Sequence, residues 1–179
     1  MTQSDDVTGP TEAMQGRRRA VLRVAGAGAG LLSGIVFAHT ATAQKRQTKQ
    51  GTGSLAIRQP GRPSPQTFMA EAARMRDLAL KAGDQGFGAV VVKGQGATAR
   101  IVGLGPSRVV SNGDPTAHAE MEAVRDACRR LKTRDLSDCT LYSTFRPCRM
   151  CESGAYWARV GRYIHGTGLT DGGAPKLGC

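Results

Sequence analysis

Two short segments, His118–Glu120 and Pro147–Cys151, constrain what this chain can fold into more than any other feature. They read H-A-E and P-C-R-M-C. One imidazole and two thiols form a ligand set that zinc prefers, and a catalytic zinc site keeps a fourth position for water. The carboxylate of Glu120 adds a catalytic group that can carry protons beside such a metal. The fold must therefore bring the histidine and both cysteines together around one zinc ion per chain.

The local setting of these residues supports a metal centre. Cys148 and Cys151 follow Pro147 at a spacing of three, so at the start of a helix both sulfur atoms lie on one face. Backbone amides at that end favour thiolates, and His118 is expected near the start of its own helix. Helical periodicity leaves the direction of Glu120 open, because residues two apart point to nearly opposite sides. A redox pair or a disulfide of the two cysteines is the alternative.

Apolar periodicity and turn residues predict alternating helices and strands after residue 63. A serine–proline pair at residues 64–65 starts a helix that ends near Gly83, and an aspartate–proline pair at residues 114–115 opens the next. A third helix runs from Pro147 to about Arg159. Short apolar runs predict strands at residues 88–92, 99–104, 139–143 and 161–165, and a glycine-rich loop is expected at residues 166–179.

This order of elements predicts an α/β fold, a three-layer sandwich in which helices flank a mixed central sheet. A turn at residues 93–96 would pair the first two strands as a hairpin. The apolar stripe of the second helix places Asp126 on the solvent side, where it pairs with Arg130. The unpaired edge of such a sheet favours a homodimer.

The N-terminal region predicts an export signal. Arg17–Arg19 precede a long uncharged stretch, and Ala-Thr-Ala at residues 41–43 is a small-residue cleavage site. The adjacent arginines resemble the bacterial twin-arginine signal, which indicates a periplasmic or extracellular protein. We assign residues 1–43 to the signal, residues 44–63 to a flexible basic linker and residues 64–179 to the folded domain. A membrane anchor is the alternative, but the glycine-rich stretch is a poor span, so no membrane span is expected after cleavage.

The net charge of +11 raises the question of a nucleic-acid partner. Aromatic residues make up only 4% of the 179 residues, and the arginines are scattered instead of forming a block. A stacking surface for single strands is therefore poorly supplied, which disfavours nucleic acid as the partner. Cys128 and Cys139 are expected in the core, whereas the pairing of Cys179 stays open.

The chain resembles the cytidine deaminase superfamily, and above all its bacterial guanine deaminase and tRNA adenosine deaminase branch. The likeness rests on residues 114–120, which read D-P-T-A-H-A-E, and on residues 147–151. It implies a cytidine deaminase-like fold and a zinc ion held by the histidine and the two cysteines. It also implies that Glu120 takes a proton from water, passes it to a ring nitrogen and helps ammonia to leave.

The same resemblance implies substrate contacts. Phe87 and Trp157 correspond to aromatic residues that line the base pocket in the guanine deaminase type, and Ser107 stands where the family usually has a base-binding asparagine. Arg146 replaces a common glutamate. A cation at a helix N-terminus is unfavourable, so this residue is expected to face an anionic group of the substrate. The chain also stops soon after the fourth strand, where relatives continue.

These observations predict a zinc-dependent hydrolase that removes the amine of a small amino-purine nucleobase of the guanine type and releases ammonia. A deaminase for another free base or nucleoside, such as cytosine, cytidine or adenosine, is the first alternative, because Ser107 and Arg146 depart from the family pattern. A deaminase that edits nucleic acid and a zinc-binding protein without turnover are the remaining alternatives.

Overall fold

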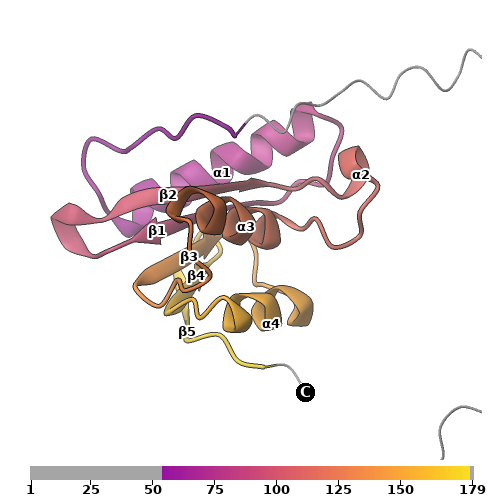
Figure 1. Ribbon diagram of the computed structural model, residues 1–179. Helices are drawn as coiled ribbons and strands as arrows, with labels where there is room; N and C mark the ends of the chain where they lie inside the picture. The colour runs from indigo at the N-terminus through magenta and orange to yellow at the C-terminus, as the bar shows by residue number, and fades with distance from the viewer. Residues whose placement is uncertain (1–53, 178–179) are drawn as a thin grey trace, which may run out of the picture. The chain divides into compact units, whose positions relative to one another are not determined.

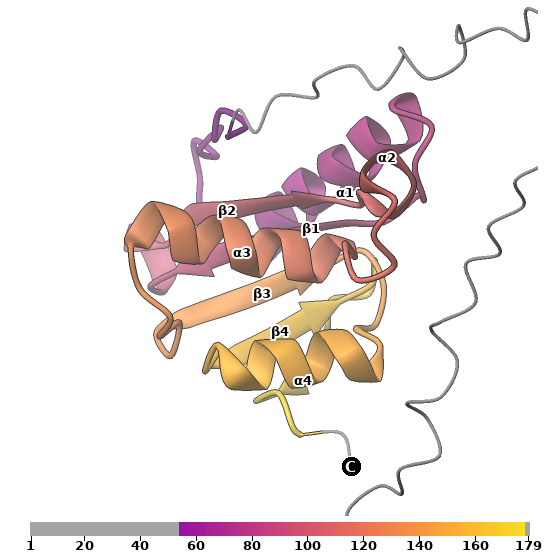
Figure 2. The same cartoon turned by 45° about the vertical axis from the view of Figure 1, so that its right-hand side comes forward.

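The computed structural model describes residues 54–177 of the chain. A five-stranded sheet forms the middle layer of this part. The helix α1 (Pro65–Lys81) covers one face of the sheet, and α3 (Ala119–Leu131) and α4 (Arg149–Trp157) cover the other (Figure 1 and Figure 2). The three-layer α/β sandwich predicted from the sequence is confirmed.

The sheet is mixed and has the strand order β2-β1-β3-β4-β5. Neighbouring strands pair antiparallel except for β3 and β4, which pair parallel. In chain order the strands span Gly88–Lys93, Arg100–Pro106, Cys139–Ser143, Arg162–His165 and Thr170–Gly173. The last of these, β5, corrects the prediction that the tail is only a loop. Its sequence, T-D-G-G, has no apolar alternation that would predict a strand. The strand forms through backbone pairing with β4.

Alternate residues of β1 contribute to two separate hydrophobic clusters. Ala89 and Val91 belong to the cluster beneath α3 and α4, whereas Val90 and Val92 belong to the cluster beneath α1. All four side chains are buried, as expected for a central strand with helices on both faces. One short apolar run thus anchors both helical layers.

The first helix, α1, begins as predicted at the serine–proline pair. The hydroxyl of Ser64 accepts a hydrogen bond from the amide of Thr67, and the hydroxyl of Thr67 accepts one from the amide of Ser64. This reciprocal capping box satisfies two backbone donors, and Pro65 at the first helical position has no donor to satisfy. After Lys81, Gly83 has a φ of 75°, which glycine adopts without strain.

The helix that carries the histidine motif starts later than the sequence predicts. The carboxylate of Asp114 accepts hydrogen bonds from the amide and the hydroxyl of Thr116 and caps only a turn. A short helix, α2 (Val109–Asn112), precedes this turn, and α3 begins at Ala119. Aspartate followed by proline starts turns as readily as helices, so the pair alone did not locate the first residue of the helix.

The helix α3 also buries a residue that was expected in solvent. Asp126 pairs with Arg130 as predicted, but its side chain is buried. Its Oδ2 atom accepts a hydrogen bond of 3.0 Å from the backbone amide of Leu104 on β2. The prediction of a solvent-facing Asp126 is therefore wrong. The cause is the unpaired outer edge of β2, whose amide group needs an acceptor inside the fold.

Two glycines of β2 let α3 approach the sheet closely. A Cβ atom at Gly105 would lie 2.0 Å from the carbonyl oxygen of Ala119, and one at Gly103 would lie 2.4 Å from that of Ala123. No side chain fits at these distances. The glycines therefore determine how near the start of α3, with its histidine motif, lies to the sheet.

Residues 54–63 contact the folded domain, although the sequence assigned them to a flexible linker. The side-chain amide of Gln59 donates to the carbonyl of Ile101 at 2.7 Å and accepts from its amide at 2.9 Å. Leu55 packs against the cluster beneath α1. The predicted linker therefore extends too far, because this segment covers the outer edge of β2.

The predicted signal at residues 1–43 lies outside the described residues, as does the start of the linker. Among residues 54–177, no helix combines the length and the apolar character that crossing a membrane requires.

Candidate metal centre and active site

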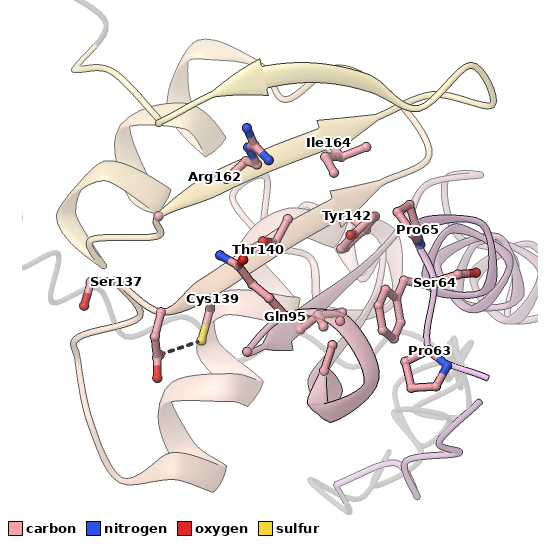
Figure 3. A pocket seen from close by; sticks show the side chains of 17 residues that line it. Pro63, Ser64, Pro65, Gln95, Ser137, Cys139, Thr140, Tyr142, Arg162 and Ile164 are labelled. Carbon is pink, nitrogen blue, oxygen red and sulfur yellow. Dashed lines mark hydrogen bonds between the residues drawn. The ribbon is translucent and has the colours of Figure 1, made fainter. Parts of the chain in front are cut away.

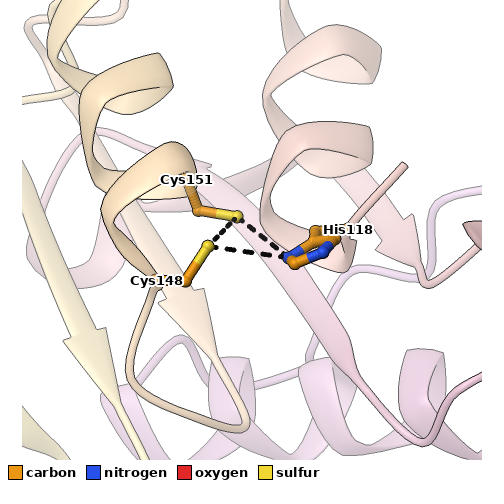
Figure 4. Close-up of side chains that lie close together, drawn as sticks. All are labelled: His118, Cys148 and Cys151. Atoms are coloured by element: carbon orange, nitrogen blue, oxygen red, sulfur yellow. Dashed lines mark hydrogen bonds between the residues drawn. The ribbon is translucent and has the colours of Figure 1, made fainter. Parts of the chain in front are cut away.

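Two helix N-termini bring the three predicted ligand side chains together. His118 directly precedes α3, Cys148 directly precedes α4, and Cys151 lies in the first turn of α4. The Nδ1 atom of His118 lies 3.7 Å from Sγ of Cys148 and 3.5 Å from Sγ of Cys151 (Figure 4). The two sulfur atoms are 3.5 Å apart. The three side chains are therefore positioned to bind one metal ion.

The ligand atoms fit a zinc ion in kind and in spacing. Zinc lies about 2.3 Å from sulfur and about 2.0 Å from nitrogen, so neighbouring ligand atoms of a tetrahedral site are roughly 3.5–3.8 Å apart. The observed separations of 3.5–3.7 Å match this range. Soft sulfur and nitrogen donors also favour zinc over magnesium or calcium. Three protein ligands leave one vertex of the tetrahedron for water.

The surroundings of the two sulfur atoms differ. Cys148 is exposed, whereas Cys151 is buried. Burial, together with the charge of Glu120 and the contact with Cys148, raises the pKa of the Cys151 thiol. The sequence predicted that helix-end amides favour the thiolate, but burial outweighs them at this position. A metal ion close by would favour the ionised thiolate of Cys151.

Glu120, whose direction periodicity left open, points into the same centre. It lies in the first turn of α3, and its side chain is only 5% exposed. Its Oε2 atom is 3.5 Å from Sγ of Cys151, and its Oε1 atom accepts a hydrogen bond of 2.8 Å from the hydroxyl of Ser143 on β3. A carboxylate beside three metal ligands, but held by a strand hydroxyl, suits proton transfer better than ligation.

An aromatic pair lies at the same end of the sheet. The rings of Phe87 and Phe145 meet edge to face at 5.3 Å, and the side chains are 38% and 57% exposed. Phe87 precedes β1 and Phe145 follows β3, and the amide of Gly88 donates to the hydroxyl of Thr144 between them. The sequence predicted Phe87 as a substrate contact. It missed Phe145, whose place three residues before Cys148 was the available signal.

Ser107 lies next to this pair but is buried. Its amide donates to the carbonyl of Phe87 at 3.1 Å, and its hydroxyl donates to Oδ1 of Asp84 at 2.9 Å. Burial opposes the ionisation of Asp84, but hydrogen bonds from Ser111, Gln85 and Ser107 outweigh it and lower the pKa to about 2. An ionised carboxylate only accepts hydrogen bonds, so the hydroxyl of Ser107 keeps only acceptor capacity for a substrate.

The structure does not bring Trp157 together with these residues. It is the last residue of α4, nine positions after Cys148, which corresponds to about 13 Å along a helix axis. Its ring is 72% exposed and contacts only the neighbouring ring of Tyr156 among the aromatic contacts described. The predicted contact of Trp157 with the substrate therefore has no support from its position.

Two arginines flank the exposed cysteine. Arg146 and Arg149 are both exposed, and neither forms a salt bridge within residues 54–177. Arg149 is the first residue of α4, where the helix dipole disfavours a cation. Both charges are therefore free to meet an anion that approaches the centre.

A cavity of about 570 Å³ lies away from the metal ligands, on the opposite face of the sheet. Figure 3 shows it between the start of α1, the β1–β2 turn and the strands β3 and β4. Its lining includes Phe68, Tyr142 and Ile164, which belong to the cluster beneath α1. None of the predicted site residues lines it, so it is not part of the candidate active site.

The remaining described cysteines belong to the core, as predicted. Cys139 is 2% exposed, and Cys128 packs against the same cluster beneath α3 and α4. Burial and the hydrogen bond to Asp138 raise the pKa of Cys139 to about 12, and burial also raises the pKa of Cys128. Neither thiol is therefore a nucleophile at neutral pH. Cys179 lies outside the described residues.

Comparisons with known proteins agree with this centre. Residues 63–167 match the family described as the cytidine and deoxycytidylate deaminase zinc-binding region. Guanine deaminase of Bacillus subtilis is 41% identical over 107 residues, which are 59% of this chain and 66% of that protein. The tRNA-specific adenosine deaminase of Aquifex aeolicus is 38% identical over 97 residues, which are 54% of this chain and 62% of that protein. The chain thus spans less than two thirds of either relative.

A solved structure supports the same relationship. The crystal structure of guanine deaminase from Bacillus subtilis superposes with a TM-score of 0.53 at 38% sequence identity. The superposition covers 57% of this chain and 64% of the other. The family match over residues 63–167 contains the three ligands and the buried carboxylate.

Proposed function

Because the chain belongs to the cytidine and deoxycytidylate deaminase zinc-binding family, we propose that it hydrolyses the amine of a small amino-purine nucleobase of the guanine type. The observation that carries this proposal is the convergence of His118, Cys148 and Cys151 beside the buried carboxylate of Glu120. The similarity to a guanine deaminase supports the substrate class. The overall reaction converts the ring amine and one water molecule into a ring carbonyl and ammonia.

The residues of the chain have separate tasks in this reaction. A zinc ion held by the three ligands would lower the pKa of a water molecule, so that this water could give up a proton and act as a nucleophile towards an electron-poor ring carbon. Glu120 carries the first proton of this water to the ring nitrogen, and then carries the second proton, from the newly attached hydroxyl group, to the leaving amine. Its burial excludes bulk water, which would otherwise exchange the proton before it reaches the substrate.

Recognition of the base is proposed to depend on the aromatic pair. The half-exposed rings of Phe87 and Phe145 offer an apolar surface beside the centre, on which a flat purine can pack. The hydroxyl of Ser107 would accept a hydrogen bond from a ring N–H or an exocyclic amine, because its own proton is held by Asp84. A guanine-type base presents such donors.

A substrate panel tests this function. The zinc-loaded full chain is incubated with guanine, adenine, cytosine, the corresponding nucleosides and single-stranded RNA, and released ammonia is measured. We expect ammonia from guanine or a related amino-purine, and a release that is at least about 100-fold slower from the Glu120→Gln variant with the same zinc content. Release from cytosine, cytidine or adenosine alone would replace the guanine-type substrate by the first alternative. Stoichiometric zinc without ammonia from any substrate would leave a zinc-binding protein without turnover.

A second function is favoured by the two free arginines. Arg146 and Arg149 flank Cys148 without carboxylate partners among the described residues, and the whole chain carries a net charge of +11. Cations at this place suit a substrate with phosphate groups, and a relative from Aquifex aeolicus is a tRNA-specific adenosine deaminase. Ammonia release from RNA but not from free bases, lost in an Arg146→Glu variant and weakened by salt, would select a nucleic-acid-editing deaminase.

We also propose that the protein is exported by the twin-arginine route and then cleaved after residue 43. The arginine pair at residues 17–18 and the small residues at 41–43 support this proposal. Replacing both arginines by lysine should retain the protein in the cytoplasm of a bacterial host. An unchanged distribution between cytoplasm and periplasm would contradict export by this route.

A further inference from the structure

A strand hydroxyl meets the carboxylate of the catalytic centre inside the fold. Ser143, the last residue of β3, is 1% exposed, and its Oγ atom donates to Oε1 of Glu120 at 2.8 Å. The amide of Phe145 lies 3.5 Å from the same Oγ atom and completes its surroundings. The hydrogen bond between Ser143 and Glu120 joins two residues that are 23 positions apart in the chain. It ties the first turn of α3 to the end of a central strand.

The two oxygen atoms of Glu120 therefore have different surroundings. Oε1 is held by Ser143, whereas Oε2 lies 3.5 Å from the sulfur of Cys151. A cysteine that binds zinc is a thiolate and has no proton to donate. With the metal bound, Oε2 faces the ligand cluster without a donor from the protein, and Oε1 keeps its donor.

We propose that Ser143 is a positioning residue that assigns different roles to the two oxygens. Ser143 holds Oε1 in place. Oε2 carries the two protons of the water in turn, the first to the ring nitrogen and the second, from the newly attached hydroxyl group, to the leaving amine. This inference rests on the proposed deaminase function. A glutamate side chain has three rotatable bonds, and a displacement of about 1 Å can lower a rate by up to roughly 100-fold. The hydrogen bond from Ser143 on β3 to Oε1 restricts the rotation of the Glu120 side chain.

The fold supplies the rigidity that such positioning needs. Ser143 pairs with Ala89 across the antiparallel β1–β3 ladder, and its neighbour Tyr142 pairs with Val90. The strand is central in the sheet and buried on both faces. A hydroxyl mounted on this strand moves less than one on a loop, so it defines the place of the carboxylate.

Kinetics of two Ser143 variants test the proposal. In the zinc-loaded full chain, Ser143→Ala should lower kcat roughly 10- to 100-fold while KM changes less than about twofold, because only the proton-carrying step loses its geometry. Ser143→Thr keeps the hydroxyl and should restore kcat to within about threefold of wild type. Wild-type kcat in Ser143→Ala, or a loss explained entirely by lower zinc content, would overturn the inference.

A matched control comes from the same strand. Thr140 lies on β3 but lines the cavity on the opposite face of the sheet. Thr140→Ala also removes a hydroxyl from β3 and should leave kcat and KM unchanged. An equal loss of kcat in this variant would mean that general damage to the strand, and not the contact with Glu120, explains the effect.

A second measurement does not depend on turnover. The midpoint of thermal unfolding is measured for Ser143→Ala in the wild-type background and in the Glu120→Ala background. The drop should be smaller in the second background, because no buried carboxylate is left without its donor. Equal drops would contradict the contact. If no substrate releases ammonia, the proposed function fails, and this cycle still decides whether Ser143 holds Glu120.

Discussion

The inner part of the metal centre and the side proposed to face the substrate differ sharply in burial, with the exposed Cys148 between them. At the centre, Cys151 is 1% and Glu120 is 5% exposed. Beside it, Phe87 and Phe145 are 38% and 57% exposed, and Trp157 at the far end of α4 is 72% exposed. The first group is held by two helix N-termini and a central strand. Phe87 and Phe145 belong to segments before and after strands, and Trp157 is the last residue of α4.

This difference separates the chemistry from its specificity. The ligands and the carboxylate are fixed by backbone geometry, so they are organised before a substrate arrives. The aromatic rings and the arginines are open to solvent and can change without loss of the fold. The structure therefore restricts the proposed reaction class more tightly than the proposed substrate, and the expected effects of substitutions should follow the same division.

The largest effect is expected at the buried ligand. Cys151→Ser should abolish zinc binding and ammonia release, because a serine hydroxyl does not replace a thiolate as a zinc ligand. Metal content by mass spectrometry and ammonia release provide the measurement. Cys128→Ser, which changes a core thiol outside the centre, is the matched control and should retain zinc. Unaltered zinc in Cys151→Ser would overturn the ligand assignment.

The next effect separates the metal from the proton carrier. Glu120→Gln keeps the shape of the side chain but removes the charge, so it should retain zinc and lose about 10²- to 10⁴-fold in kcat. The rate of ammonia release at saturating substrate, normalised to bound zinc, measures this loss. A zinc content that falls together with the rate would instead place Glu120 among the groups that hold the metal.

A smaller effect tests the exposed side of the comparison. Phe145→Ala should raise KM for the base roughly tenfold, because stacking on an aromatic side chain contributes about 1–3 kcal/mol per base. Trp157→Ala should change KM less than about twofold, since this ring lies at the opposite end of α4. Initial rates over a range of base concentrations give both values. A larger effect at Trp157 than at Phe145 would restore the sequence prediction.

The last effect concerns stability instead of turnover and involves Asp84, a buried anchor near Ser107. The pKa of Asp84 is lowered to about 2, so the ionised form stabilises the fold above pH 4, and this stabilisation is lost as the pH falls towards 2. Asp84→Asn should cost about 2 kcal/mol of unfolding free energy at pH 7. The difference from wild type in urea unfolding should shrink between pH 4 and pH 2. A difference that is constant over this range would contradict the role of the charge.

The sequence predicted the parts of the site that chemistry restricts. Few residue types bind zinc, and the spacing of Cys148 and Cys151 on a helix leaves little freedom, so their convergence with His118 was predictable. The class of fold followed from alternating elements, and the cap of α1 followed from Ser64 and Pro65.

Residues whose role depends on tertiary contacts were not predictable in the same way. Nothing in the local pattern predicts that the hydroxyl of Ser143 donates a hydrogen bond to Glu120, or that the hydroxyl of Ser107 donates one to Asp84. The short β5 arises from pairing with β4. The late start of α3 arises from a competing turn at Asp114. Such contacts join distant segments, and a single sequence carries no periodic signal for them.

The pairing of Gln59 with Ile101 also affects how chains meet one another. A free outer strand offers its amide and carbonyl groups to any second chain and so seeds fibrils or sheet-extended assemblies. On β2 one such pair of groups is already occupied by the side-chain amide of Gln59, which imitates an added strand. Growth of the sheet at this position therefore first requires displacement of the Gln59 side chain.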